Sequence, residues 1–227
     1  MQAPTLTIRP LGESAVVVEF GDVISESLNQ RAISLCDELN SHPFGGFIEA
    51  FPAYSSATVF YDLVQVRRSY PQFESAFSLV ESLVLQTASR LSTVVIRTGS
   101  TIEIAVDFSA RSGLDLESVS VSCGLTVDRV IEIFTERTYR VFMVGFLPGF
   151  AYMGEVDQRI RQPRRQQPRL KVPKGSVAIA GSQTGVYPLE TPGGWQILGR
   201  TNVEFFRPLA DSPSLLKPGD QVRFVAV

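Results

Sequence analysis

The first 95 residues contain four short apolar runs and two segments in which apolar residues recur at helical spacing. The runs are rich in β-branched side chains and predict strands at Thr5–Ile8, Ala15–Phe20, Ile48–Phe51 and Thr58–Tyr61. Ser25 is a candidate N-cap for a helix whose apolar positions recur every three or four residues. Pro71 suits the first turn of a second helix with an apolar face. The order strand–strand–helix–strand–strand–helix predicts a small sheet with helices on one face.

The pattern changes after residue 95 into short apolar runs punctuated by glycine and proline. Seven of these runs predict strands, at Val94–Arg97, Ile102–Val106, Val141–Phe146, Val177–Ala180, Gln196–Leu198, Val203–Phe206 and Val222–Val227. Two short helices are expected between the second and third of them, with Thr126 as the cap of the second helix. Many short strands with little helix are typical of a barrel or sandwich. We therefore predict two domains, 1–95 and 96–227, joined near residues 92–98.

Composition excludes several classes of protein. Of 227 residues, 44% are hydrophobic and 19% charged, as in ordinary globular proteins. Two cysteines exclude a disulfide framework, and a single histidine excludes a histidine cluster at a metal. The longest apolar run, Val141–Met153, is broken by glycine and proline and is too short to span a membrane. The first residues show no basic-then-apolar leader, so we expect a cytoplasmic protein without membrane partners.

Charge is divided unevenly between the two halves. Residues 1–95 carry 5 basic and 10 acidic side chains, whereas residues 96–227 carry 16 and 13. The overall charge of −2 is too small to steer the whole molecule toward nucleic acid. Each half must therefore be considered separately when a binding site is sought.

The basic surplus is concentrated in Arg159–Lys174, and no acidic residue occurs between Gln158 and Leu189. This segment is either a solvated loop with one or two paired arginines or an anion site for a carboxylate, phosphate or carbamoyl group. No aromatic residue interleaves the charges, so nucleic acid is not an expected partner.

Two further segments carry candidate chemistry. Gly145–Gly154 holds aromatic residues between glycines and proline, and it is either a buried connection or a loop that faces a ligand. Pro173–Thr201 has two glycine-rich turns around a strand pair and presents Ser182, Gln183, Thr184, Tyr187 and Trp195. Such amide, hydroxyl and phenol groups orient a carbonyl or an oxyanion, although tight barrel turns also explain the glycines. Neither segment contains a nucleotide-binding loop.

Five motifs in the second half carry a family resemblance. They are Gly-Phe-Leu-Pro-Gly-Phe-Ala-Tyr at 145–152, Pro-Arg at 168–169, Val-Pro-Lys-Gly-Ser-Val-Ala-Ile-Ala-Gly at 172–181, Gln-Thr-Gly-Val-Tyr-Pro at 183–188 and Thr-Pro-Gly-Gly-Trp-Gln-Ile-Leu-Gly-Arg-Thr at 191–201. The chain thus resembles the family of the 5-oxoprolinase B subunit, and residues 46–56 match that family more loosely. The family also includes KipI, an inhibitor of a sporulation histidine kinase, and a domain of allophanate hydrolase and urea amidolyase.

The resemblance implies a fold, an activity and partners. The implied fold is α+β, with a small α/β domain of ferredoxin-like type followed by a cyclophilin-like β-barrel domain. The implied activity is an ATP-dependent opening of 5-oxo-L-proline to L-glutamate, in a complex with the A and C subunits of 5-oxoprolinase. ATP is then used by the complex, and this chain itself is expected to bind no cofactor or metal. The alternatives are a KipI-type inhibitor of a sensor histidine kinase and a protein related to allophanate hydrolase or urea amidolyase.

Nine residues at matching positions form the candidate site. We expect Gln183 and Thr184 to orient the substrate or a reactive intermediate, with Tyr187 as the third catalytic candidate. The expected substrate-binding or anion-binding residues are Arg169, Lys171, Ser176, Trp195, Arg200 and Phe150. Among these, Arg169 and Lys171 are expected to hold an anionic group, and Trp195 to wall the pocket with Tyr187.

Two positions depart from the family pattern. Phe134 stands where a histidine is usual, and Phe108–Arg111 stands where a Tyr-Gly-Gly-Glu type of turn is expected. Phenylalanine cannot accept a proton, and Arg111 reverses the expected charge. These departures predict either a different substrate or the loss of catalysis.

Overall fold

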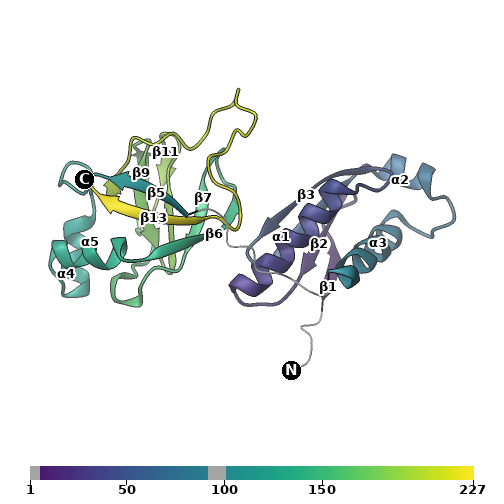
Figure 1. Cartoon of the computed structure of the whole chain (residues 1–227), viewed down its shortest axis with the longest axis horizontal. Coiled ribbons are helices and arrows are strands. Elements are labelled where there is room, and N and C mark those ends of the chain that lie inside the picture. The colour runs from purple at the N-terminus through teal and green to yellow at the C-terminus, as the bar shows by residue number, and fades with distance from the viewer. Residues whose placement is uncertain (1–5, 92–100) are drawn as a thin grey trace. The chain divides into compact units, whose positions relative to one another are not determined.

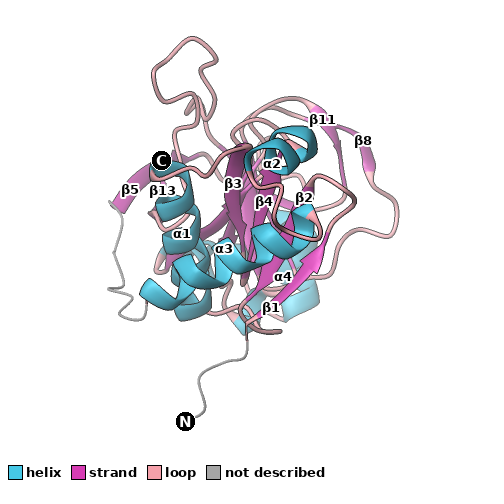
Figure 2. Cartoon of the chain, turned by 90° about the vertical axis from the view of Figure 1, so that its right-hand side faces the viewer, coloured by secondary structure: helices cyan, strands magenta, loops and turns pink. Residues whose placement is uncertain are grey.

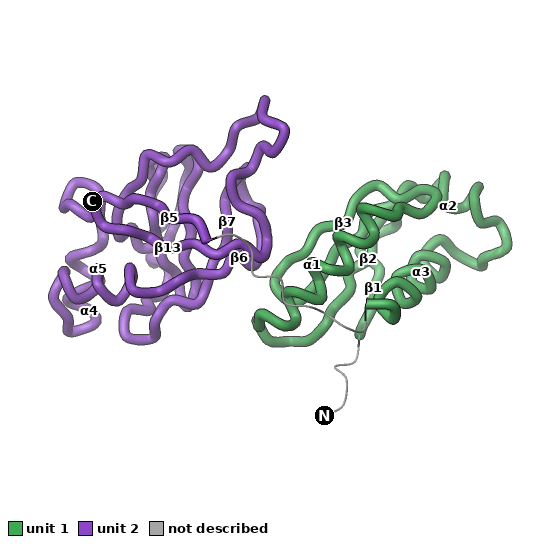
Figure 3. The backbone as a smooth tube through the Cα atoms, viewed as in Figure 1, with its two compact units in different colours: residues 1–97 green, residues 98–227 purple. Residues whose placement is uncertain are grey.

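The computed structural model describes residues 6–91 and 101–227. It divides the chain into two compact units, residues 1–97 and residues 98–227 (Figure 3). The expected strand Val94–Arg97 and the expected link at 92–98 lie outside the described residues. That the two halves are independent domains stays a prediction.

The first unit is a four-stranded antiparallel sheet with helices on one face. The strand order is β1-β2-β4-β3, with the bounds Thr7–Pro10, Ala15–Glu19, Ser56–Tyr61 and Phe47–Ala53 in that order. Helices α1 (Glu26–Ser41) and α3 (Ala76–Arg90) lie in front of the sheet in Figure 2. The alternation of strand residues turns Val16, Val18 and Val59 toward these helices to form a buried core.

Helix caps explain which predictions succeed in this unit. The Ser25 side chain accepts a hydrogen bond from the backbone N–H of Leu28, which confirms it as the N-cap of α1. The expectation that Pro71 opens a helix is wrong. A short helix, α2 (Leu63–Ser69), ends before it, and α3 begins after a capping box between Ser75 and Ser78. In this box the two serine side chains accept hydrogen bonds from backbone N–H groups at the start of the helix, whereas a proline only lacks such a group. The box therefore sets the start of α3.

The second unit is a seven-stranded, nearly closed sheet. Its strand order is β12-β9-β10-β7-β6-β13-β5, with the bounds Gln196–Arg200, Ser176–Ala180, Gln183–Val186, Ala151–Gly154, Thr138–Val144, Gln221–Ala226 and Thr101–Val106 in that order. Neighbouring strands are antiparallel except β13 and β5. An isolated bridge between Asp107, just after β5, and Arg200, at the end of β12, joins the two edges. We call this part the barrel unit.

Two helices pack on the barrel unit. Helix α4 (Leu116–Cys123) contacts β12, and helix α5 (Val127–Thr135) contacts β13, beside which it is drawn in Figure 1. The Thr126 hydroxyl accepts a hydrogen bond from the backbone N–H of Arg129, which confirms Thr126 as the cap of α5. Apolar side chains from the strands and both helices fill the interior as one buried cluster.

Several strand assignments differ from expectation. Val203–Phe206 is not a strand, and its last residue makes only an isolated bridge to Ser214. Part of the expected loop Gly145–Gly154 is strand β7. Strand β10 and the separate pair β8 (Arg169–Val172) and β11 (Thr191–Gly193) were not predicted. They contain glycine, proline or charged residues, and pairing with distant strands outweighs such weak local preferences. In the described ranges, every helix is too short or too polar to cross a membrane.

Candidate ligand-binding site

Five aromatic rings converge on the outer face of the barrel unit. Phe150 lies at their centre, and its ring centroid is 4.7 to 5.6 Å from those of Phe146, Tyr152, Tyr187 and Trp195. We call these five residues the aromatic cluster. Phe150 directly precedes β7, Tyr187 directly follows β10 and Trp195 directly precedes β12, and their rings meet over the outer face of β9. The small Ala178 and Ala180 leave room over the outer face of β9, whereas Val177 and Ile179 point into the core.

Tyr187 is a buried phenol in this cluster. Burial raises its pKa above the ordinary value, and a backbone hydrogen bond at Trp195 and the charges of Arg164 and Arg169 oppose the rise. A phenol that keeps its proton at neutral pH can donate a hydrogen bond but cannot serve as a general base. Gly193 lies against it, since a Cβ there would be 2.5 Å from the Tyr187 hydroxyl. Tyr187 is therefore held closely in place.

The other expected polar residues lie on neighbouring strands. Thr184 is fully buried and its hydroxyl donates to the Ala178 carbonyl at 3.0 Å. Ser176 is also buried, with its hydroxyl donating to the Pro173 carbonyl at 2.8 Å. The Thr184 hydroxyl therefore links β10 to β9, and the Ser176 hydroxyl closes the turn that leads into β9. Gln183 begins β10 and is partly exposed.

An unexpected carboxylate organises the basic segment. Asp115 is 2% exposed and accepts hydrogen bonds from both terminal nitrogens of Arg169, each at 2.8 Å. Arg165 donates to the same carboxylate at 2.6 Å, and the backbone N–H of Ile197 donates at 2.7 Å. We call these residues the Asp115 cluster. Nothing in the local sequence around Asp115 indicates it, because its arginine partners lie 50 and 54 residues further along the chain.

The remaining cations of the expected anion site also have partners. Lys171 pairs with Glu190 at 3.3 Å, and Lys174 lies 3.8 Å from Glu204. Arg200 donates through Nε to the Lys174 carbonyl at 2.9 Å. The structure thus brings Phe150, Tyr187 and Trp195 together, while Arg169 and Lys171 face carboxylates of this chain.

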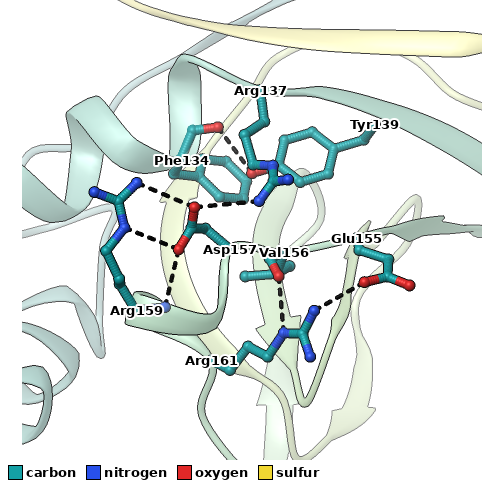
Figure 4. A network of polar contacts seen from close by, with 8 residues as sticks. All are labelled: Phe134, Arg137, Tyr139, Glu155, Val156, Asp157, Arg159 and Arg161. Atoms are coloured by element: carbon teal, nitrogen blue, oxygen red, sulfur yellow. Dashed lines mark hydrogen bonds and ion pairs between the residues drawn. The ribbon is translucent and has the colours of Figure 1, made fainter.

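A second charge network lies at the start of the basic segment (Figure 4). Asp157 accepts hydrogen bonds from Arg159, through its backbone N–H and its guanidinium, and from Arg137 at 3.2 Å. These bonds favour the ionised form and lower the pKa of Asp157. Arg161 pairs with Glu155 at 2.9 Å and donates to the Val156 carbonyl. Both Arg159 and Arg161 are therefore paired.

A pocket of about 420 Å³ is lined in part by Arg165. Its lining side chains are mostly amides and hydroxyls, from Ser118, Val119, Ser122, Gln162, Arg165, Gln166, Gln167 and Gln196. The pocket reaches the Asp115 cluster through Arg165. Within residues 6–91 and 101–227 we find no group of three histidine, cysteine or acidic side chains placed to hold a metal ion.

Comparisons with known proteins assign this arrangement to a class. Residues 6–216 match the family model of the carboxyltransferase domain, subdomains C and D. Proteins named as the B subunit of 5-oxoprolinase are similar over nearly the whole chain. The one from Bacillus subtilis strain 168 is 41% identical, covering 97% of this chain and 92% of the relative. The one from Escherichia coli O157:H7 is 39% identical, covering 95% and 93%. The chain belongs to the carboxyltransferase-domain family that contains the 5-oxoprolinase B subunit.

A solved structure extends the comparison. The crystal structure of TTHA0988 superposes with a TM-score of 0.79 at 33% identity and covers 97% of this chain. The match takes up 40% of that protein, so this chain spans less than half of its length.

Phe134, one of the positions that departs from the expected family pattern, lies in the core of the barrel unit. It is fully buried, its ring stacks on Phe224 at 5.0 Å, and its backbone carbonyl accepts a hydrogen bond from Tyr139. It also packs against Phe108, another departing residue, at 6.2 Å. Arg111, by contrast, is exposed and lies 4.0 Å from Asp107. Phe134 and Phe108 thus lie in the core, whereas Arg111 lies on the surface.

Introducing a histidine at position 134 is expected to make stability pH-dependent. The apolar site would keep the imidazole of Phe134→His neutral and lower its folded-state pKa below the ordinary value of about 6.5. Because the unfolded chain then binds the extra proton, stability falls as pH decreases through about 6.5. We expect a loss of about 2 kcal/mol at pH 8 and roughly a further 1 kcal/mol at pH 5.5.

Urea unfolding at the two pH values measures this effect. Phe134→Leu is the matched control, since it removes the ring without adding a titratable group. Equal pH dependence in the two variants would contradict a dry core at this position.

Proposed function

We propose that this chain is the B subunit of an ATP-dependent 5-oxoprolinase that converts 5-oxo-L-proline to L-glutamate. The observation that carries the proposal is the 39–41% identity to proteins named as the 5-oxoprolinase B subunit over at least 95% of this chain. In the proposed complex the chain acts with the A and C subunits and leaves ATP chemistry to them. The absence of a nucleotide-binding loop from its sequence supports that division of labour.

Within the complex, we place the substrate contact of this chain at the aromatic cluster. The exposed ring of Phe146 and the partly exposed ring of Tyr152 offer apolar surface of the kind that covers a five-membered lactam ring. The buried rings of Tyr187 and Trp195 pack against Phe150 behind that surface. Gln183, at the partly exposed start of β10, is the proposed polar group that orients the lactam amide. We further propose that the seven-stranded sheet is a cyclophilin-like barrel.

Reconstitution tests this function. We expect the chain, co-expressed with the A and C subunits from the same organism, to form a complex that releases L-glutamate from 5-oxo-L-proline only when ATP is supplied. Complexes that omit this chain are expected to be inactive, and glutamate released per ATP hydrolysed is the quantity to measure. A fully assembled complex without activity on 5-oxo-L-proline would contradict the substrate assignment. In that case, binding to sensor histidine kinases or activity on allophanate would distinguish the alternatives.

A further inference from the structure

One cation of the basic segment differs from all the others. Six of the seven basic side chains in Arg159–Lys174 pair with a carboxylate, as described above. Arg164 is the seventh. Its side chain is exposed, and within the described part of the chain no acidic side chain lies within ion-pair distance of it. It is therefore a guanidinium available to an external anion.

The backbone on both sides of Arg164 is fixed beside Trp195. The carbonyl of Pro163 accepts a hydrogen bond at 3.1 Å from the side chain of Gln196, the residue after Trp195. The backbone N–H of Arg165 donates at 2.7 Å to the carbonyl of Gly194, the residue before Trp195. Two hydrogen bonds thus hold Arg164 at the edge of the aromatic cluster. A loop anchored in this way presents its guanidinium with little loss of conformational entropy on binding.

Electrostatics agree with this placement. Burial raises the pKa of Tyr152 and of Tyr187, and the positive charge of Arg164 opposes the rise at both phenols. Arg169 also acts on Tyr187, but its terminal nitrogens already bind Asp115 in a bidentate pair. Arg164 therefore supplies positive charge to the cluster without being neutralised by a carboxylate of the protein.

We propose that Arg164 binds the carboxylate group of a small substrate whose ring lies against the aromatic cluster. The assignment rests on the proposed function, for which 5-oxo-L-proline is the substrate. It moves the expected anion-binding role from Arg169 and Lys171 to Arg164. A guanidinium and a carboxylate form two parallel hydrogen bonds, so the pair also fixes the direction of the lactam ring.

Steady-state kinetics of the assembled complex tests the proposal. We expect Arg164→Gln to raise the KM for 5-oxo-L-proline by roughly 10- to 100-fold, with kcat changed by less than about threefold, because a charge-assisted hydrogen bond to substrate is lost. Arg164→Lys is expected to recover part of the loss. Arg159→Gln, which removes a paired arginine of the same segment, is the control and is expected to behave like the wild type.

A neutral substrate analogue separates charge recognition from structural damage. The wild-type complex is expected to discriminate against 5-oxo-L-prolinamide, which lacks the carboxylate, and Arg164→Gln is expected to lose most of that discrimination. If the wild type is active and Arg164→Gln keeps both its KM and its discrimination, the role of Arg164 is wrong while the proposed function stands. If the wild-type complex is inactive, calorimetric binding of 5-oxo-L-proline to the full chain replaces kinetics. Binding that is absent, or equal in wild type and Arg164→Gln, overturns the assignment.

Discussion

Replacing Asp115 with asparagine is expected to destabilise the barrel unit by about 3 to 5 kcal/mol. The substitution keeps the shape of the side chain but removes the only negative charge in the Asp115 cluster. Arg165 and Arg169, whose side chains are 34% and 21% exposed, would then remain partly buried without a counter-charge. The hydrogen bond from Ile197 to the carboxylate, which ties α4 to β12, would weaken as well.

Urea unfolding followed by tryptophan fluorescence measures this loss. The chain has a single tryptophan, Trp195, which is buried in the barrel unit beside the Asp115 cluster and therefore reports on that unit. Asp157→Asn is the matched control, since Asp157 also pairs with two arginines but near the surface (Figure 4). We expect it to cost about 1 kcal/mol or less. Equal losses of unfolding free energy in Asp115→Asn and Asp157→Asn would contradict the claim that burial of the Asp115 carboxylate causes its larger contribution to stability.

Local sequence signals were sufficient for the elements that depend on local interactions. Ser25 and Thr126 were predicted as caps because a serine or threonine before a helical stripe satisfies backbone donors within three residues. The Pro71 prediction failed because two local signals competed, and the Ser75–Ser78 capping box was not recognised. Strands β10 and β11 escaped prediction because their stability comes from neighbours distant in sequence.

The candidate site also contains some features that local sequence signals indicate and others that depend on residues distant in sequence. Phe150, Tyr187 and Trp195 were predicted, and the structure brings their rings together. The sequence did not show which arginines of Arg159–Lys174 pair with a carboxylate. Arg164 and Arg169 each follow a proline and look equivalent along the chain. The fold places Asp115, at the start of α4, against Arg169. Only the structure therefore shows that Arg169 is neutralised by a carboxylate and Arg164 is not.

Gly175 is expected to be the glycine of the barrel unit that tolerates a side chain least. It has a φ of +84°, a conformation that is costly for residues with a Cβ, and a Cβ built there would lie 2.0 Å from the Thr201 carbonyl oxygen. The backbone cannot easily move away, because Gly175 donates to the Tyr187 carbonyl at 2.7 Å and accepts from Thr201 at 2.9 Å. We expect Gly175→Ala to cost about 3 to 4 kcal/mol, the sum of backbone strain and overpacking.

Gly181→Ala separates the two contributions. Gly181 also has a positive φ, of +59°, in the turn between β9 and β10, but a Cβ there would meet no atom within 4 Å. This control is expected to cost about 1 to 2 kcal/mol, the strain of the left-handed conformation alone. The difference between the variants in Trp195-monitored unfolding then measures the steric conflict with Thr201. Because Gly175 bonds to the carbonyl of Tyr187, Gly175→Ala is also expected to disturb the aromatic cluster and alter Trp195 fluorescence before unfolding begins. Equal losses in the two alanine variants, with native fluorescence unchanged, would mean that the turn before β9, which contains Gly175, can relax without disturbing the site.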